Sequence, residues 1–128
     1  IVAERWRQEL SENAKVIAKT EAYPESAHND LVAWQALQDV SKGFVLVESS
    51  EGPLCAAVDE LLSEVYSGQK DVVVRVAPRG DTPLARLLQG SLTAGYASTY
   101  LAMLNGVDPR VTAITGRYKE LLEKRGLT

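Results

Sequence analysis

Residues 44–76 read FVLVESSEGPLCAAVDELLSEVYSGQKDVVVRV, and this stretch decides the fold. It opens with the apolar run Phe44–Val47 and closes with Val72–Val76, each bounded by turn-forming residues, which is typical of buried parallel strands. Between them, Pro53 stands where a helix would begin, and an apolar stripe from Leu54 to Val65 follows at helical spacing. Strands that alternate with helices indicate an α/β domain with a parallel sheet.

The flanking segments are mostly helical. A helix is predicted at the N-terminus from Val2, Trp6 and Leu10, which recur every four residues. The stretch from Val16 to Tyr23 fits a short strand or an extended loop. Further helices are expected from Asn29 to about Lys42, from Thr82 to about Asn105, and from Asp108 onward. The helix from Thr82 is apolar on most sides, which predicts burial in a core or at a subunit interface. In the last helix, an inward-facing stripe is expected at Val111, Ile114, Leu121 and Leu122.

Composition excludes several classes of protein. The 128 residues suit one domain, 45% of them are hydrophobic and 24% charged, and the formal net charge is −3. That argues against disorder, and no basic cluster is long enough to follow a nucleic-acid backbone. No apolar run reaches the length of a membrane span, and no metal-binding or nucleotide-binding motif is present. The single Cys55 excludes an internal disulfide and fits a cytoplasmic location.

The chain begins with Ile1 inside a helical pattern, and initiator methionine is normally removed only before small residues. We therefore expect a domain of a longer protein. With only two clear strands, the sheet is expected to lack its first strand in this segment.

Three side chains are candidates for proton-transfer chemistry. His28 precedes a predicted helix start, whose positive end favours a neutral imidazole that can exchange a proton. Glu12 lies near a helix C-terminus, where a carboxylate is disfavoured, as suits a general base. Lys119 lies beside the apolar face of the last helix. Each has a simpler interpretation: a capping histidine, a solvated glutamate, and a lysine paired with Glu123. Composition and spacing alone therefore leave the reaction open.

Three longer stretches carry a family resemblance. They are ELSENAK at residues 9–15, PESAHNDLVAW at residues 24–34 and YASTYLAMLNGVDP at residues 96–109. In order and spacing they resemble the second sugar isomerase (SIS) domain of the bifunctional phosphoglucose/phosphomannose isomerases. The resemblance covers nearly the whole chain and implies the SIS fold, a three-layer α/β/α sandwich with a flavodoxin-like parallel sheet.

The resemblance also implies a reaction. Glucose 6-phosphate or mannose 6-phosphate would be interconverted with fructose 6-phosphate through a cis-enediol, without a cofactor, by a dimer of chains that each hold two SIS domains. The N-terminal SIS domain would bind the phosphate, so the present domain alone is expected to be inactive.

The motif positions imply roles for particular residues. Glu12 would be the base that moves a proton between C2 and C1, and His28, reaching the site of the neighbouring subunit, would open the sugar ring. Lys119 would contact sugar oxygens and steady the developing charge. The same motifs make Asn13 and Asn29 candidates for substrate binding.

Some positions depart from the family pattern: Ser11 replaces an asparagine, Asp30 replaces a glutamate, and Gly116 interrupts the helix of Lys119. Two alternatives stay open. One is a non-catalytic SIS module that senses a sugar phosphate, and the other is a module whose main task is dimerisation through the helix from Leu84 to Leu104.

Overall fold

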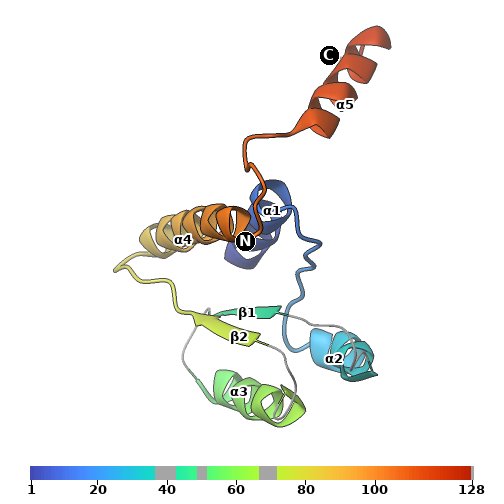
Figure 1. Cartoon of the computed structure of the whole chain (residues 1–128). Coiled ribbons are helices and arrows are strands. Elements are labelled where there is room, and N and C mark those ends of the chain that lie inside the picture. Colours follow the sequence, from blue (N-terminus) through green and yellow to red (C-terminus); the bar gives the residue numbers. More distant parts are fainter. Residues whose placement is uncertain (37–42, 49–51, 67–71, 128) are drawn as a thin grey trace.

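The computed structural model describes residues 1–36, 43–48, 52–66 and 72–127. Five helices and two strands follow one another within these ranges (Figure 1). They are α1 (Val2–Asn13), α2 (Ser26–Ala36), β1 (Gly43–Val47), α3 (Pro53–Tyr66), β2 (Val72–Val76), α4 (Pro83–Leu104) and α5 (Ala113–Lys124). The described residues include no helix long and apolar enough to cross a membrane.

The two predicted strands pair in parallel. The register runs from Gly43 opposite Val72 to Val47 opposite Val76, with α3 as the crossover between β1 and β2. Parallel neighbours require such a crossover, because the chain must return to the same end of the sheet before the next strand begins. The α/β class with a parallel sheet is therefore confirmed. The stretch from Val16 to Ala22 forms a loop and no strand.

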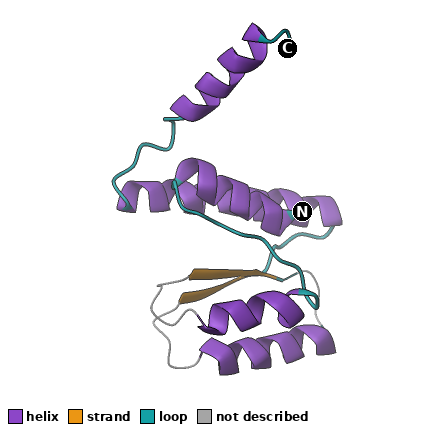
Figure 2. Ribbon diagram, turned by 90° about the vertical axis from the view of Figure 1, so that its right-hand side faces the viewer, coloured by secondary structure: helices purple, strands orange, loops and turns teal. Residues whose placement is uncertain are grey.

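Helices cover both faces of this sheet and form three layers (Figure 2). On one face lie α1 and α4, and on the other lie α2 and α3. A small apolar core fills the second interface. It is centred on the buried Leu31 of α2 and Leu62 of α3, with Phe44 and Leu46 of β1 packed against them. The predicted helix end at residues 41–42 lies outside the described part of the chain.

The contact between α1 and α4 depends on small side chains. Gly90, Ala94, Ser98 and Ala102 recur every four residues along α4, and all four are buried. A Cβ added at Gly90 would lie 2.7 Å from Cγ1 of Val2, so the two helices approach too closely for a larger residue there. Trp6, only 6% exposed, is the buried side chain of α1. At the other end of α1, the hydrogen bond from Asn13 to Ser98 holds the last turn of the helix, and thus Glu12, against α4.

The start of α4 follows the prediction. Thr82 is the N-cap, and its side-chain oxygen accepts a hydrogen bond of 3.1 Å from the backbone N–H of Ala85, while Pro83 takes the first helical position. Before the cap, Gly80 has a φ of +146°, and a Cβ there would lie 2.6 Å from Cβ of Ala85. The turn from β2 into α4 therefore requires glycine at this position.

The other side of α4 is exposed in a single copy of the chain. Along its length runs a row of large apolar side chains, which we call the α4 ridge: Leu84, Leu88, Leu92, Tyr96, Tyr100 and Met103 are each between 61% and 64% exposed. The burial predicted for this helix therefore holds for only one of its sides within this chain.

The prediction for the last helix is wrong in two respects. Helix α5 begins at Ala113, five residues after Asp108, because Asp108 and Arg110 form a turn of their own in which Nη2 and Nε of Arg110 donate to the Asp108 carboxylate. Of its four expected inward residues, Val111, Ile114 and Leu121 are exposed, and Leu122 is half-buried. Figure 1 shows the reason: α5 stands away from the layers, and no other described part of the chain packs against it.

Candidate active site

Glu12 lies in the last turn of α1, and its side chain points into solvent. Helix α1 ends directly afterwards, because the backbone N–H of Ala14 closes the last turn onto the Leu10 carbonyl at 3.1 Å and Lys15 then adopts a φ of +59°. A carboxylate at such a position is accessible to a substrate. The described residues of the same chain do not shield it.

The neighbouring Asn13 is turned inward, toward α4. Its Nδ2 donates to Oε2 of Glu9 at 2.7 Å and to Oγ of the fully buried Ser98 at 2.9 Å. An amide nitrogen carries two hydrogens, so both are used within the protein. Asn13 therefore has only its carbonyl oxygen with which to accept a hydrogen bond from a substrate.

Lys15, the last residue of the first motif, joins that motif to the third. Its Nζ donates to the Glu12 carbonyl at 2.5 Å and to the Pro109 carbonyl at 3.4 Å. Together with the bond from Asn13 to Ser98, this contact places residues 9–15 beside residues 96–109. The two stretches are thus neighbours in space although about 90 residues separate them in sequence.

His28 and Asn29 lie on α2, on the other face of the sheet. The helix begins at Ser26 and not at Asn29 as predicted, because turn hydrogen bonds already link Ala27 to Pro24 and His28 to Glu25. His28 therefore lies in the first turn of the helix, with its side chain exposed. Nδ2 of Asn29, also exposed, donates to Oε1 of Glu25 at 3.5 Å.

Lys119 lies on α5 and is exposed. Helix α5 runs through Gly116 without a break. The ion pair on this helix joins Arg117 to Glu120 at 3.1 Å, and the alternative pair of Lys119 with Glu123 is not formed within the described residues. The lysine is thus free to meet a group outside this chain.

One copy of the described chain does not bring the three catalytic candidates together. Glu12 lies with α1 on one face of the sheet, His28 lies with α2 on the other, and Lys119 is carried by the separate α5 (Figure 1). What the chain does assemble is the helical support of Glu12, which consists of α1, α4 and the turn that follows α4.

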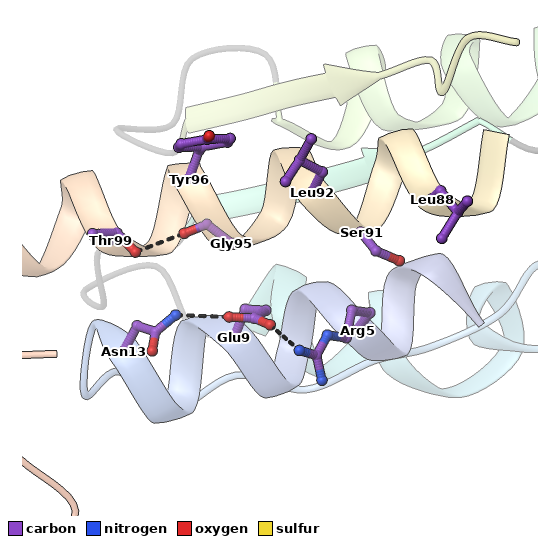
Figure 3. A pocket seen from close by; sticks show the side chains of 9 residues that line it. All are labelled: Arg5, Glu9, Asn13, Leu88, Ser91, Leu92, Gly95, Tyr96 and Thr99. Carbon is purple, nitrogen blue, oxygen red and sulfur yellow. Dashed lines mark hydrogen bonds and ion pairs between the residues drawn. The ribbon is translucent and has the colours of Figure 1, made fainter. Parts of the chain in front are cut away.

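A groove runs along that support, and sequence reasoning missed it. It is an open hollow of about 530 Å³ between α1 and α4 (Figure 3), lined by Arg5, Glu9, Asn13, Leu88, Ser91, Leu92, Gly95, Tyr96 and Thr99. In it, Glu9 accepts from Asn13 and forms an ion pair with Arg5. The spacing of Ser91, Gly95 and Thr99, four residues apart on a helix, was the available signal.

The turn after α4 carries a perturbed carboxyl group. Hydrogen bonds from the Arg110 guanidinium and backbone N–H lower the pKa of Asp108 to about 2, and the charge of Lys15 adds a smaller effect in the same direction. The backbone N–H of Arg110 donates to Oδ1 of Asp108 at 2.9 Å. Among the described residues, no three His, Cys, Asp or Glu side chains are grouped so as to hold a metal ion.

Comparison with known proteins identifies a family of similar domains and several similar enzymes. The family model for the bacterial phospho-glucose isomerase C-terminal SIS domain matches residues 1–122. The bifunctional phosphoglucose/phosphomannose isomerase of Aeropyrum pernix is 34% identical over 125 residues, which are 94% of this chain and 38% of that protein. The enzymes of the same name from Aquifex aeolicus and Thermoplasma volcanium are 29% and 28% identical, over 96% and 93% of this chain and 39% and 38% of their own length.

The chain therefore spans about two fifths of the length of these curated relatives. No solved structure matches it significantly.

Proposed function

This chain belongs to the bacterial phospho-glucose isomerase C-terminal SIS domain family, and on that basis we propose that it supplies the proton-transfer residues of a phosphosugar isomerase. The reaction would interconvert glucose 6-phosphate or mannose 6-phosphate with fructose 6-phosphate. The observation that carries the proposal is the position of Glu12: it lies in the stretch at residues 9–15 that resembles the family's motif, and its carboxylate is exposed at the end of a helix packed against α4.

The chemistry proposed for Glu12 moves one proton. In the open-chain aldose, its carboxylate removes the proton from C2 and leaves a cis-enediolate, whose O1 takes up a proton to give the cis-enediol. The proton held by Glu12, or a solvent proton that has exchanged with it, is delivered to C1 while the O2 hydroxyl loses its proton, and this gives the ketose. Such a transfer requires a carboxylate within hydrogen-bond reach of both carbons and uses no cofactor.

The other candidates would act before and during that step. His28 would open the sugar ring by exchanging a proton with the ring oxygen and the hydroxyl at C1. Lys119 would lie against the sugar oxygens that gain negative charge as the enediol forms. Asn29, and Asn13 through its carbonyl oxygen, would orient the sugar hydroxyls.

We propose that this domain works as the C-terminal part of a longer chain, whose N-terminal SIS domain binds the sugar phosphate. The relatives named above are more than twice as long as this chain, which supports this arrangement. The isolated domain is expected to show no isomerase activity, and a robust rate from it would contradict the proposal.

We also propose that the active protein is a homodimer in which His28 acts on the site of the neighbouring subunit. Two observations support this. Glu12 and His28 lie on opposite faces of the sheet within one chain, and the α4 ridge offers an uncharged apolar surface from Leu88 to Met103. Light scattering over a dilution series of the full-length protein tests the point, and a strict monomer at high concentration would count against it.

The test of the function is Glu12→Gln in the full-length protein, with Glu4→Gln on the same helix as the matched control. Glu4 is an exposed residue that pairs with Arg7, far from the end of α1. The change at Glu12 removes the base and keeps the shape, so turnover should fall by about 100-fold or more while sugar-phosphate binding persists. The change at Glu4 should leave both intact.

Other outcomes separate the alternatives. If binding and turnover fall together at Glu12→Gln, the glutamate is not mainly a base. If the wild-type protein binds sugar phosphates but turns none over, the domain is a sensor. That reading is favoured by one observation, that the three candidates do not meet within a single copy.

A further inference from the structure

Lys15 has an unusual backbone conformation. Among the described residues, it is the one non-glycine residue with a positive φ, +59°. It follows the C-cap of α1, where glycine or asparagine normally takes the left-handed conformation, and another side chain costs about 1 kcal/mol or more. A lysine at a position that favours glycine suggests that its side chain has a use of its own.

That side chain spans two segments. Its ammonium group donates to the carbonyl of Glu12, one of the last carbonyls of α1, and to the carbonyl of Pro109 in the connection between α4 and α5. A cation at a helix C-terminus is also favoured by the negative end of the helix dipole. The charge of Lys15 is felt by the neighbouring Asp108 as well, whose pKa it helps to lower.

Within the connection, Gly106 and Val107 are hydrogen-bonded to the last turn of α4, and Arg110 is hydrogen-bonded to Asp108. Helix α4 ends at Leu104 with Asn105 as its C-cap, and α5, which stands away from the layers, begins at Ala113. Because the Val107 N–H is bonded to the Ala102 carbonyl, the chain from Val107 to Ala113 can extend roughly 21 Å, whereas a chain held at Pro109 can extend only roughly 14 Å before the helix begins. A hold at Pro109 therefore shortens the range over which α5 can be displaced by about a third.

We propose that Lys15 is a positioning residue: it ties the Pro109 connection to the end of α1 and so sets where Lys119 lies relative to Glu12. This inference rests on the proposed function for the roles of those two residues. It assigns Lys15 no contact with the substrate. Its effect on turnover passes through Lys119.

The variant Lys15→Asn tests the tether without straining the turn. Asparagine adopts the left-handed conformation readily, so α1 should end as before, but its short side chain does not reach Pro109. In the full-length protein, we expect the midpoint of urea unfolding of Lys15→Asn to equal that of the wild type or to lie at a slightly higher urea concentration. Lys15→Arg, which keeps the charge and the reach, is the rescue variant, and Lys124→Met at the far end of α5 is the matched control.

The first readout is a double-mutant cycle on kcat. Lys15→Asn should lower kcat by about 10- to 100-fold, as expected for a reacting group misplaced by an ångström or so, with KM nearly unchanged. The same change should have no further effect in the Lys119→Met background, because the two residues act as one unit. Lys15→Arg should recover most of the rate. An equal loss in both backgrounds, or no loss in either, would overturn the proposal.

The second readout does not depend on activity. Hydrogen exchange of the backbone amides in residues 105–112 should become faster in Lys15→Asn and stay unchanged in Lys124→Met. Unchanged exchange in Lys15→Asn overturns the tether, whatever the kinetics show. Faster exchange in a protein whose wild type has no isomerase activity would support the tether and refute the proposed function, so the two failures can be told apart.

Discussion

The inward orientation of Asn13 leads to a prediction with a definite magnitude. The change Asn13→Asp keeps the shape of the side chain but replaces the donating amide with a carboxylate. Two hydrogen bonds are lost, one to the neutral Oγ of Ser98 and one to the Glu9 carboxylate. A neutral bond contributes about 1 kcal/mol and a bond to a charged group about 2 kcal/mol, so the variant should lose about 3 kcal/mol near pH 7.

The loss should depend on pH. In the variant, the new carboxylate faces Oε2 of Glu9 across the 2.7 Å that an N–H of Asn13 bridges in the wild type. Two carboxylates this close repel each other, so the pair binds a proton more tightly than a single carboxylate does. The folded state therefore has the higher pKa. The variant is least destabilised in mild acid, where the shared proton can restore a hydrogen bond, and most destabilised once the pH rises above that pKa.

The assay is urea unfolding of the full-length protein, followed by tryptophan fluorescence at pH 5 and pH 8, since the buried Trp6 lies on the same helix. Ser98→Ala removes only the neutral bond and should cost about 1 kcal/mol at both pH values. Asn29→Asp makes the same chemical change at an exposed site and should stay within about 0.5 kcal/mol of wild type. An Asn13→Asp loss as small as that control, or one that does not grow with pH, would refute the reasoning.

Three further predictions concern other parts of the molecule. Ala94→Leu overfills the buried contact with α1 and should lower the free energy of unfolding in urea by about 1–3 kcal/mol. Ala57→Leu, at an exposed position of α3, should not lower it, and equal effects of the two changes would contradict the packing described. Leu92→Lys on the α4 ridge should leave monomer stability within about 0.5 kcal/mol but weaken the dimer in light scattering, and an unchanged dimer would place its interface elsewhere. Because its pKa in the fold is lowered to about 2 from an ordinary 3.8, Asp108 stabilises the turn fully above pH 3.8 and loses that effect as the pH falls through 2. NMR titration of Arg110→Gln should find the pKa of Asp108 raised part of the way toward 3.8, because the guanidinium is lost and the backbone N–H of residue 110 remains; a value still near 2 would exclude the guanidinium as the main cause.

The sequence predicted those parts of the fold whose signals are local. The strands Phe44–Val47 and Val72–Val76 are short apolar runs, and Thr82-Pro83 is a cap followed by a proline, so a few neighbouring residues suffice to identify each. The close contact of α1 with α4 was missed although its signal, the spacing of Gly90, Ala94, Ser98 and Ala102, is present in the sequence. Apolar periodicity is carried by large side chains, whereas this contact depends on small ones.

The error at α5 has a different origin. An apolar stripe predicts that one face of a helix is buried, but it does not identify the surface that buries it. Ile114 and Leu121 are not buried by any described part of this chain, and neither are the residues of the α4 ridge. A turn built by Asp108 and Arg110 also delayed the helix start, because a proline after an aspartate opens a turn as readily as it opens a helix.

The candidate site could be predicted only through resemblance. Glu12, His28 and Lys119 are single residues of common types, and nothing in their local sequence separates a catalytic group from a solvated one. Their spatial relation depends on where α1, α2 and α5 lie relative to the sheet and to other chains. The contact of Lys15 with Pro109 was equally out of reach, since it depends on a backbone angle and on a neighbour 94 positions away.

The most direct test of the account is the fate of the C1 proton of fructose 6-phosphate in heavy water. With the full-length protein, deuterium should enter C1 of the remaining substrate and C2 of the aldose products, because a base that holds the proton lets it exchange with solvent. Glu12→Gln should lose this exchange together with turnover, while Glu4→Gln keeps both. Exchange at C1 that continues at the wild-type rate in Glu12→Gln would contradict the assignment of Glu12 as the base.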